Sequence, residues 1–247
     1  MCNCRKVGLP APLNYDRGKM EEEMGDDELL NLVGGDDSNK KKHTWESVAK
    51  ERISKINDNE DQKRTFDKIM NAVHSKKGGD RLFFLEGPGG CGKTFIYNTL
   101  IAQLRHEKRS VIACASTGIA ALLLMGGSTA HRAFRIPEDV NREMPPRYAW
   151  EKDDAKRIRN AEVLIIDEVS MLHRDVLDFI DRTLQDLQPR DEEKLPFGGK
   201  VVLLGGDWKQ LLPVVPGIDN LNSALKFVFL FSKCFQENRL GSRYLLA

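Results

Sequence analysis

Apolar residues in this sequence follow a helical period in some segments and form short continuous blocks in others. The pattern of apolar and polar residues changes at Trp45. After it, apolar positions recur at steps of three and four residues, as the buried face of a helix requires. This stripe consists of Phe66, Ile69, Met70 and Val73. Asn57 or Asp58 is suited to cap the helix, because short polar side chains accept hydrogen bonds from its free N–H groups. The pattern predicts an amphipathic helix that packs against a core.

Short apolar blocks alternate with helical stripes through the rest of the chain. Blocks of strand length lie at 81–85, 110–115, 163–166 and 200–204. Stripes with helical spacing lie at 95–104, 117–125 and 176–187. Apolar strands that alternate with helices form parallel sheets, which bind ligands at the carboxyl ends of their strands. We therefore expect an α/β fold with helices on both faces of a parallel sheet.

A glycine-rich turn joins the first predicted strand to the helix that follows it. The turn consists of Gly87, Pro88, Gly89, Gly90, Cys91, Gly92, Lys93 and Thr94. It fits G-x-x-x-x-G-K-[ST] in full, which chance produces in about one of a hundred chains of this length, so a simple surface turn is the weaker interpretation. In such a P-loop, backbone N–H groups cradle phosphates, an exposed Lys93 would reach the β- and γ-phosphates, and Thr94 would ligate Mg²⁺.

An acidic pair follows the third predicted strand. Asp167 and Glu168 come directly after the apolar block 163–166, where a P-loop protein needs carboxylates. Asp167 would hold Mg²⁺, and Glu168 would act as a general base or orient the attacking water. A surface acidic pair is the alternative, which the P-loop upstream disfavours. The sequence thus predicts a P-loop NTPase that binds and hydrolyses ATP.

Two longer motifs connect the sequence to a family. They are DEVSM at 167–171 and GGDWKQLLPV at 205–214. Together they resemble motifs of the PIF-type (petite integration frequency) DNA helicases of superfamily one, in particular relatives in the rolling-circle transposons of eukaryotes. The resemblance runs from about Asn57 to Val215. It implies the RecA-like first motor domain of an ATP-dependent DNA helicase that moves 5′ to 3′ on single-stranded DNA, with roles in DNA repair, recombination and telomere maintenance.

The resemblance also implies roles for residues around the nucleotide. Gln62, which ends the run 57–62, would hydrogen-bond the edge of the adenine base. Gln210 would sense the γ-phosphate, and Asp207 would fix its loop. Arg239 resembles the arginine of the family's Asn-x-Arg motif, which reaches the γ-phosphate. Here the residue between the asparagine and the arginine is missing.

Four further residues would contact single-stranded DNA according to the same resemblance. Thr117 and Thr129 can donate hydrogen bonds to phosphate oxygens. His131 can donate or stack, and Phe134 offers a face for a base. By spacing alone, His131 is more typical of a polar residue hydrogen-bonded within the protein, and Phe134 of a core residue. The resemblance favours DNA contact for both instead.

These assignments divide the chain into three regions. We expect a disordered, charged leader at 1–43, a RecA-like P-loop domain at 44–240, and a short tail at 241–247 in place of a second RecA-like domain. An alternative function is a truncated, nucleotide-dependent module that grips single-stranded DNA without unwinding. Another is an unrelated P-loop enzyme such as a GTPase or small-molecule kinase; no N-K-x-D guanine motif is present, and the Gln62 motif favours adenine.

Composition adds limits on partners and location. Lys and Arg number 38 against 37 Asp and Glu, so any nucleic-acid contact must be local. Cys2 and Cys4 have no second pair nearby, which favours free thiols in a reducing compartment over a metal site. No apolar run approaches the ~20 residues of a membrane span, so we expect a soluble protein. The lysines at 40–42 are a solvated charge run or a nuclear signal; we expect a nuclear location, with mitochondria as the alternative.

Overall fold

The computed structural model describes five stretches of the chain and the backbone of a sixth. They are residues 44–75, 80–141, 144–146, 153–189 and 194–207, with the backbone of 244–246. All belong to the second of two units into which the chain divides, Thr44–Ala247. The expected leader, Gln210 and Arg239 lie outside the described residues.

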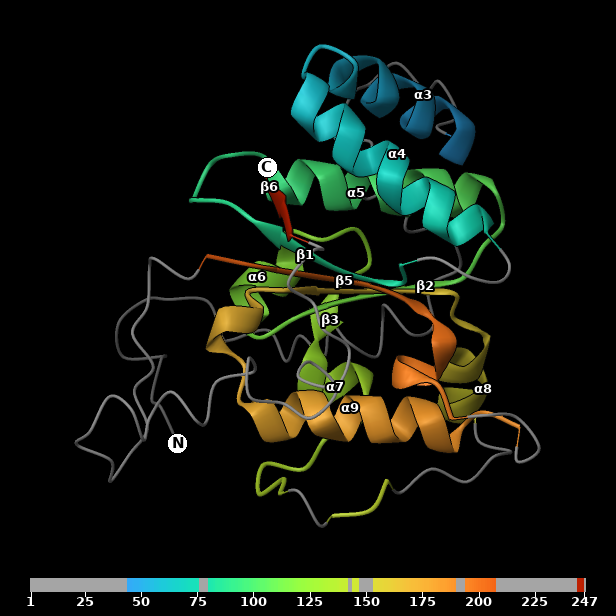
Figure 1. Cartoon of the computed structure of the whole chain (residues 1–247), viewed down its shortest axis with the longest axis vertical. Helices are drawn as coiled ribbons and strands as arrows, with labels where there is room; N and C mark the ends of the chain where they lie inside the picture. Colours follow the sequence, from blue (N-terminus) through green and yellow to red (C-terminus); the bar gives the residue numbers. More distant parts are fainter. Residues whose placement is uncertain are drawn as a thin grey trace, which may run out of the picture. The chain divides into compact units, whose positions relative to one another are not determined.

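Six parallel strands form one sheet at the centre of this unit (Figure 1). Their order across the sheet is β3 (Ser128–Thr129), β2 (Val111–Ala115), β4 (Val163–Asp167), β5 (Val201–Gly206), β1 (Leu82–Glu86) and β6 (Tyr244–Leu246). The four predicted apolar blocks are confirmed as strands, shifted by one or two residues. Both β4 and β5 are buried along their whole length, as expected of central parallel strands. The short edge strands β3 and β6 were not predicted.

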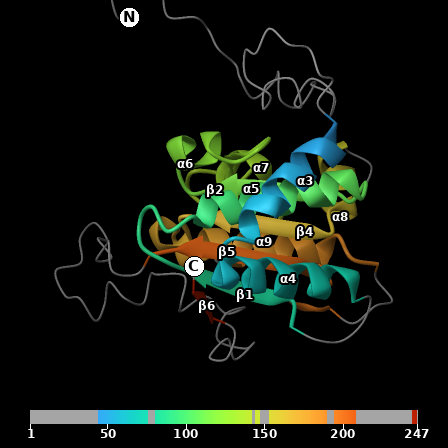
Figure 2. The ribbon, with the colours of Figure 1, turned by 90° about the horizontal axis from the view of Figure 1, so that it is seen from above.

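Helices cover both faces of the sheet, as the alternating pattern predicted (Figure 1). One face carries α3 (Trp45–Ile56), α4 (Glu60–His74) and α5 (Lys93–His106). The other carries α7 (Ala130–Ala133), α8 (Asp153–Asn160) and α9 (Arg174–Asp186). Turned by 90°, the ribbon shows α3 lying against α5 (Figure 2). Three short elements lie near strand ends: α6 (Gly118–Leu122) and the 3-10 turns η2 (Val169–Met171) and η3 (Pro196–Gly199).

The cap of the first predicted stripe differs from the expectation. Asn57 is the carboxyl-terminal cap of α3, so neither it nor Asp58 starts the next helix. Asn59 caps α4 instead, because its side chain accepts hydrogen bonds from the backbone N–H groups of Asp61 and Gln62, both at 3.1 Å. The stripe itself is confirmed, and all four of its apolar members are buried.

The helix predicted at 117–125 is much shorter in the structure. After α6 the chain turns through Gly126, whose φ of 65° lies in the left-handed region that favours glycine. Gly127 has no space for a side chain, since a Cβ atom there would lie 2.5 Å from the Ala121 carbonyl oxygen and 2.6 Å from Leu124 Cβ. These two glycines direct the chain into β3.

The hydrophobic core between the sheet and the second helical face confirms another predicted stripe. From α9 and its cap it includes Val176, Leu177, Ile180, Leu184 and Leu187. Among the described helices, none combines the length and the apolar character that crossing a bilayer requires.

Candidate nucleotide site

The glycine-rich turn leaves β1 and enters α5 with an open helix terminus. Gly90 and Gly92 adopt φ values of 81° and 94°, a conformation that side chains disfavour. Gly92 is the amino-terminal cap of α5, and it offers no side chain to the N–H groups of the first turn. Free N–H groups at the positive end of a helix are suited to bind an anion such as phosphate.

Lys93 begins α5 and is 8% exposed, so the expectation of an exposed loop lysine is wrong. Its ammonium group donates hydrogen bonds to the backbone carbonyls of Gly87 and, at 3.1 Å, of Pro88. A buried charge needs such partners because its removal from water is costly. The backbone carbonyls of the turn therefore hold the ammonium group of Lys93 inside the loop.

Gln62 lies against the same turn although it is distant in the sequence. From the first turn of α4, its side-chain amide donates to the carbonyl of Cys91 at 3.3 Å. A Cβ atom on Gly92 would collide with that amide, which is a second reason for glycine at this position. The fold thus brings the proposed adenine-reading residue to the P-loop, while its contact with a base stays a prediction.

Asp167 and Glu168 stand at the carboxyl end of β4, and both carry raised pKa values. Asp167 is 4% exposed, and burial raises its pKa against the opposing effects of a hydrogen bond from the Glu168 N–H and the charge of Lys93. Burial also raises the pKa of Glu168, and the charges of Asp167 and Asp207 add to the effect. The carboxylates of Asp167 and Glu168, whose ionisation burial disfavours, are perturbed groups of the kind that gather at functional sites.

The backbone at Glu168 supports the same interpretation. Its φ of 52° is left-handed, which is uncommon for a residue with a side chain. The Glu168 N–H donates to Asp167 Oδ1 at 2.9 Å, so the unusual turn ties the Asp167 carboxylate to the Glu168 backbone. Strained residues of this kind gather at functional sites.

The oxygen ligands available fit Mg²⁺ that arrives with a nucleotide. Thr94, in the first turn of α5, is half-buried, and Asp167 is a buried carboxylate with a raised pKa. Within the described residues, no group of three or more His, Cys, Asp or Glu side chains is arranged to hold a metal ion. Mg²⁺ needs only one or two carboxylates when phosphates and waters complete its shell. The residues therefore fit a nucleotide-bound cation better than a metal centre made of protein alone.

Three hydroxyl groups near the acidic pair were missed by sequence reasoning. Those of Tyr97, Ser116 and Ser170 are buried, and none makes a hydrogen bond of regular geometry with the described residues. Ser116 follows β2 and donates its backbone N–H to the Asp167 carbonyl at 3.2 Å, and Ser170 packs against Gly206. Tyr97 carried a usable signal, because it follows Lys93 by four residues and so shares its helix face.

The threonines expected to contact DNA already serve as helix caps. The Thr117 hydroxyl accepts from the Ala120 N–H and caps α6, and the Thr129 hydroxyl accepts from the Arg132 N–H and caps α7, both at 3.3 Å. A hydroxyl that accepts one hydrogen bond can still donate its proton. Their contact with phosphates therefore stays a prediction.

Phe134 belongs to the core, so the expectation that it stacks on a base is wrong. Its ring is 0% exposed and lies in the hydrophobic cluster below the sheet. His131 is half-buried on α7, and its contact with DNA stays a prediction. The exposed apolar residues of this region are instead Ile119, Leu122 and Leu123, in and just after α6.

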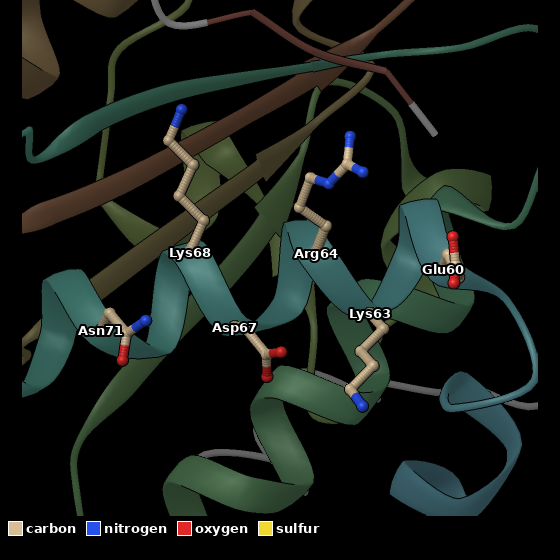
Figure 3. Close-up of a pocket in the computed structure, with 6 residues that line it drawn as sticks. All are labelled: Glu60, Lys63, Arg64, Asp67, Lys68 and Asn71. Carbon is tan, nitrogen blue, oxygen red and sulfur yellow. The ribbon is translucent and has the colours of Figure 1, made fainter.

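A hollow along the outer side of α4 is separate from these residues (Figure 3). Its described lining consists of Glu60, Lys63, Arg64, Asp67, Lys68 and Asn71. Figure 3 shows Arg64 and Lys68 extending to one side of the helix and Lys63 and Asp67 to the other. None of these lining residues is a predicted site residue.

Comparisons with known proteins agree on one family. The model of the PIF1-like helicase family matches residues 57–239. The ATP-dependent DNA helicase RRM3 of Saccharomyces cerevisiae is 32% identical over 181 residues, which are 70% of this chain and 24% of the yeast protein. The ATP-dependent DNA helicase Pif1 of Psychrobacter is 36% identical over 165 residues, 66% of this chain and 24% of that protein. The chain thus spans about a quarter of the length of these relatives.

Solved structures show the same likeness in three dimensions. The Pif1 helicase from Bacteroides in complex with ADP-AlF3 and single-stranded DNA aligns with a TM-score of 0.55 and 30% identity. The alignment covers 74% of this chain and 41% of the Bacteroides chain. This likeness confirms the RecA-like P-loop fold that the motifs implied.

Proposed function

The chain belongs to the PIF1-like helicase family, and from this premise we propose that it is the ATP-hydrolysing part of a DNA helicase. It binds ATP with Mg²⁺, hydrolyses it, and uses the energy to move along single-stranded DNA and unwind it. The observation that carries the proposal is the convergence of Lys93, Asp167 and Glu168, since the charge of Lys93 acts on both carboxylates.

Phosphate binding uses groups that are already in place. The free N–H groups at the start of α5 receive the phosphates, and Lys93 exchanges the carbonyls of Gly87 and Pro88 for phosphate oxygens. Charged acceptors form stronger hydrogen bonds than carbonyls, which favours the exchange. Because the Lys93 ammonium is already fixed before nucleotide binds, little side-chain conformational entropy is lost on binding.

Glu168 is the proposed general base for hydrolysis. Water attacks the γ-phosphorus, the bond to the β–γ bridging oxygen breaks, and Glu168 takes the proton of the water. Its raised pKa makes it a better proton acceptor than an ordinary glutamate. Thr94 and Asp167 would hold Mg²⁺, which supplies charge neutralisation on the phosphates when bound.

The DNA part of the proposal is supported by similarity and by position. A similar Pif1 helicase from Bacteroides was solved with single-stranded DNA. Thr117 and Thr129 adjoin the carboxyl ends of β2 and β3, on the sheet edge that also carries Asp167. From the family resemblance we also propose 5′-to-3′ movement, roles in repair, recombination and telomere maintenance, and a nuclear or mitochondrial location.

Release of phosphate from ATP, with and without an oligothymidylate strand, tests this function. We expect turnover that requires Mg²⁺, rises when the strand is added, and is weaker with GTP because Gln62 is suited to adenine. Binding of ATP and DNA without turnover would favour the nucleotide-dependent binding module instead. Failure to bind ATP at all would overturn the proposal.

A further inference from the structure

Tyr97 buries a hydroxyl group beside the acidic pair without giving it a regular partner. The residue lies on α5 one turn after Lys93 and is 0% exposed. Its hydroxyl interacts with the Asp167 carboxylate but does not reach the geometry of a regular hydrogen bond. Phenylalanine would fill the same space without this cost, so packing accounts for the ring but not for the hydroxyl.

The hydroxyl is directed at the carboxylate that would hold Mg²⁺. A Cβ atom added to Gly205 would collide with the Tyr97 hydroxyl and would lie 3.1 Å from Asp167 Oδ1. The tyrosine oxygen, the glycine and the carboxylate therefore meet at one point. Glycine at 205 is what allows α5 to bring a hydroxyl this close to the end of β4.

The two oxygens of Asp167 are in different situations. Oδ1 accepts the Glu168 N–H at 2.9 Å and is the oxygen that faces Tyr97 and Gly205. A second donor to Oδ1 would fix the rotation of the carboxylate and leave Oδ2 for a cation.

We propose that Tyr97 is a positioning residue, whose hydroxyl donates to Asp167 Oδ1 in the nucleotide-bound protein and so orients Oδ2 toward Mg²⁺. The inference rests on the proposed function, since it assigns a supporting contact to the same site. Groups that orient metal ligands in this way typically change metal affinity about 10- to 100-fold when they are removed.

Tyr97→Phe removes the hydroxyl and keeps the ring. We expect the Mg²⁺ concentration for half-maximal binding of a fluorescent, non-hydrolysable ATP analogue to rise about tenfold. The Mg²⁺ requirement for phosphate release should rise in parallel, while turnover at saturating Mg²⁺ changes less. Without nucleotide and Mg²⁺, the variant should unfold at the same temperature as the parent or higher, because it no longer buries a hydroxyl that lacks a regular hydrogen bond.

Thr99→Val is the matched control on the same helix. Thr99 is also 0% exposed, but its hydroxyl donates to the Phe95 carbonyl at 2.7 Å and takes no part in the site. We expect this variant to leave the Mg²⁺ dependence unchanged. An equal shift in both variants would mean that any disturbance of α5 has this effect, and would overturn the proposal.

Two other outcomes would also overturn it, and they are distinguishable. If Tyr97→Phe lowers the unfolding temperature but keeps the parent's Mg²⁺ dependence, the hydroxyl is structural, and the proposed function stands. If the parent itself binds the ATP analogue equally well with and without Mg²⁺, the proposed Mg²⁺ site fails, and the role of Tyr97 fails with it.

Discussion

The carboxyl ends of β4 and β2 are neighbours in the sheet, yet the regions after them are built differently. After β4, Asp167 and Glu168 carry pKa values raised chiefly by burial. After β2 and its neighbour β3, the hydroxyls of Thr117 and Thr129 accept hydrogen bonds as helix caps. Phe134, farther along, lies in the core. The carboxylates after β4 lie where burial disfavours their charge, whereas the two threonine hydroxyls already accept hydrogen bonds that the fold itself requires.

This difference shows where a structure without ligands can indicate chemistry. A buried carboxylate whose ionisation is disfavoured destabilises the fold, and a bound cation can offset that effect. The region after β4 therefore points to phosphate and cation. The helix caps after β2 and β3 would be needed for folding even if the protein bound no DNA. The proposed DNA contacts of these threonines therefore rest on the family resemblance.

Lys93→Ala should have the largest effect on the β4 side of this comparison. We expect phosphate release to fall at least about 100-fold and ATP binding to weaken, because no other described side chain takes the place of this charge. Loss of the hydrogen bonds to Gly87 and Pro88 should also cost about 1–2 kcal/mol of stability. Phosphate release and thermal unfolding measure the two effects. Parent-like turnover in the variant would remove the P-loop assignment.

Glu168→Gln should separate binding from turnover. The amide keeps the shape of the side chain but accepts no proton, so we expect turnover to fall about 100- to 10,000-fold with ATP binding retained. Glu162→Gln, an exposed change just before β4, is the control and should leave turnover unchanged. Hydrolysis at the parent rate in Glu168→Gln would show that another group is the base.

On the β2 side, Phe134→Ala should lower the stability of the protein rather than act directly on its affinity for DNA. Emptying a fully buried aromatic site costs about 3–5 kcal/mol, measurable as a lower urea midpoint. His131→Ala, at a half-buried position, is the companion variant and should cost less than about 1 kcal/mol while weakening DNA binding. If both variants lose DNA affinity equally at full stability, the assignment of Phe134 to the core would be wrong.

The pH dependence of stability should give the smallest effect. The pKa of Glu168 is raised above 4.5 in the folded protein, so the native state keeps this proton to higher pH than the unfolded chain. Its contribution to stability is fully present below 4.5 and is lost as pH rises through the raised value. Urea unfolding of the parent and of Glu168→Gln across this window should show a weaker pH dependence in the variant. Identical profiles would contradict the raised pKa.

Local patterns in the sequence were enough to predict the four inner strands, the P-loop and the acidic pair. Strand positions follow from apolar blocks, and the positions of Lys93 and Asp167 follow from short motifs whose spacing is dictated by one strand and one turn. Errors arose where a neighbour decided the outcome. Asn59 rather than Asn57 caps α4 because Asn57 is the carboxyl-terminal cap of α3, and α6 ends at Leu122, before the turn through Gly126 and Gly127.

The sequence by itself determined which residues can carry the chemistry, because residue type and local spacing are properties of the chain. Tertiary structure decided which of them meet. It placed Gln62 against Cys91, buried Lys93 among carbonyls, and brought Tyr97 to Asp167 across Gly205. It also put Phe134 into the core. Burial, and the pairing of groups far apart in the chain, arise only when the helices pack on the sheet, and no local pattern encodes them.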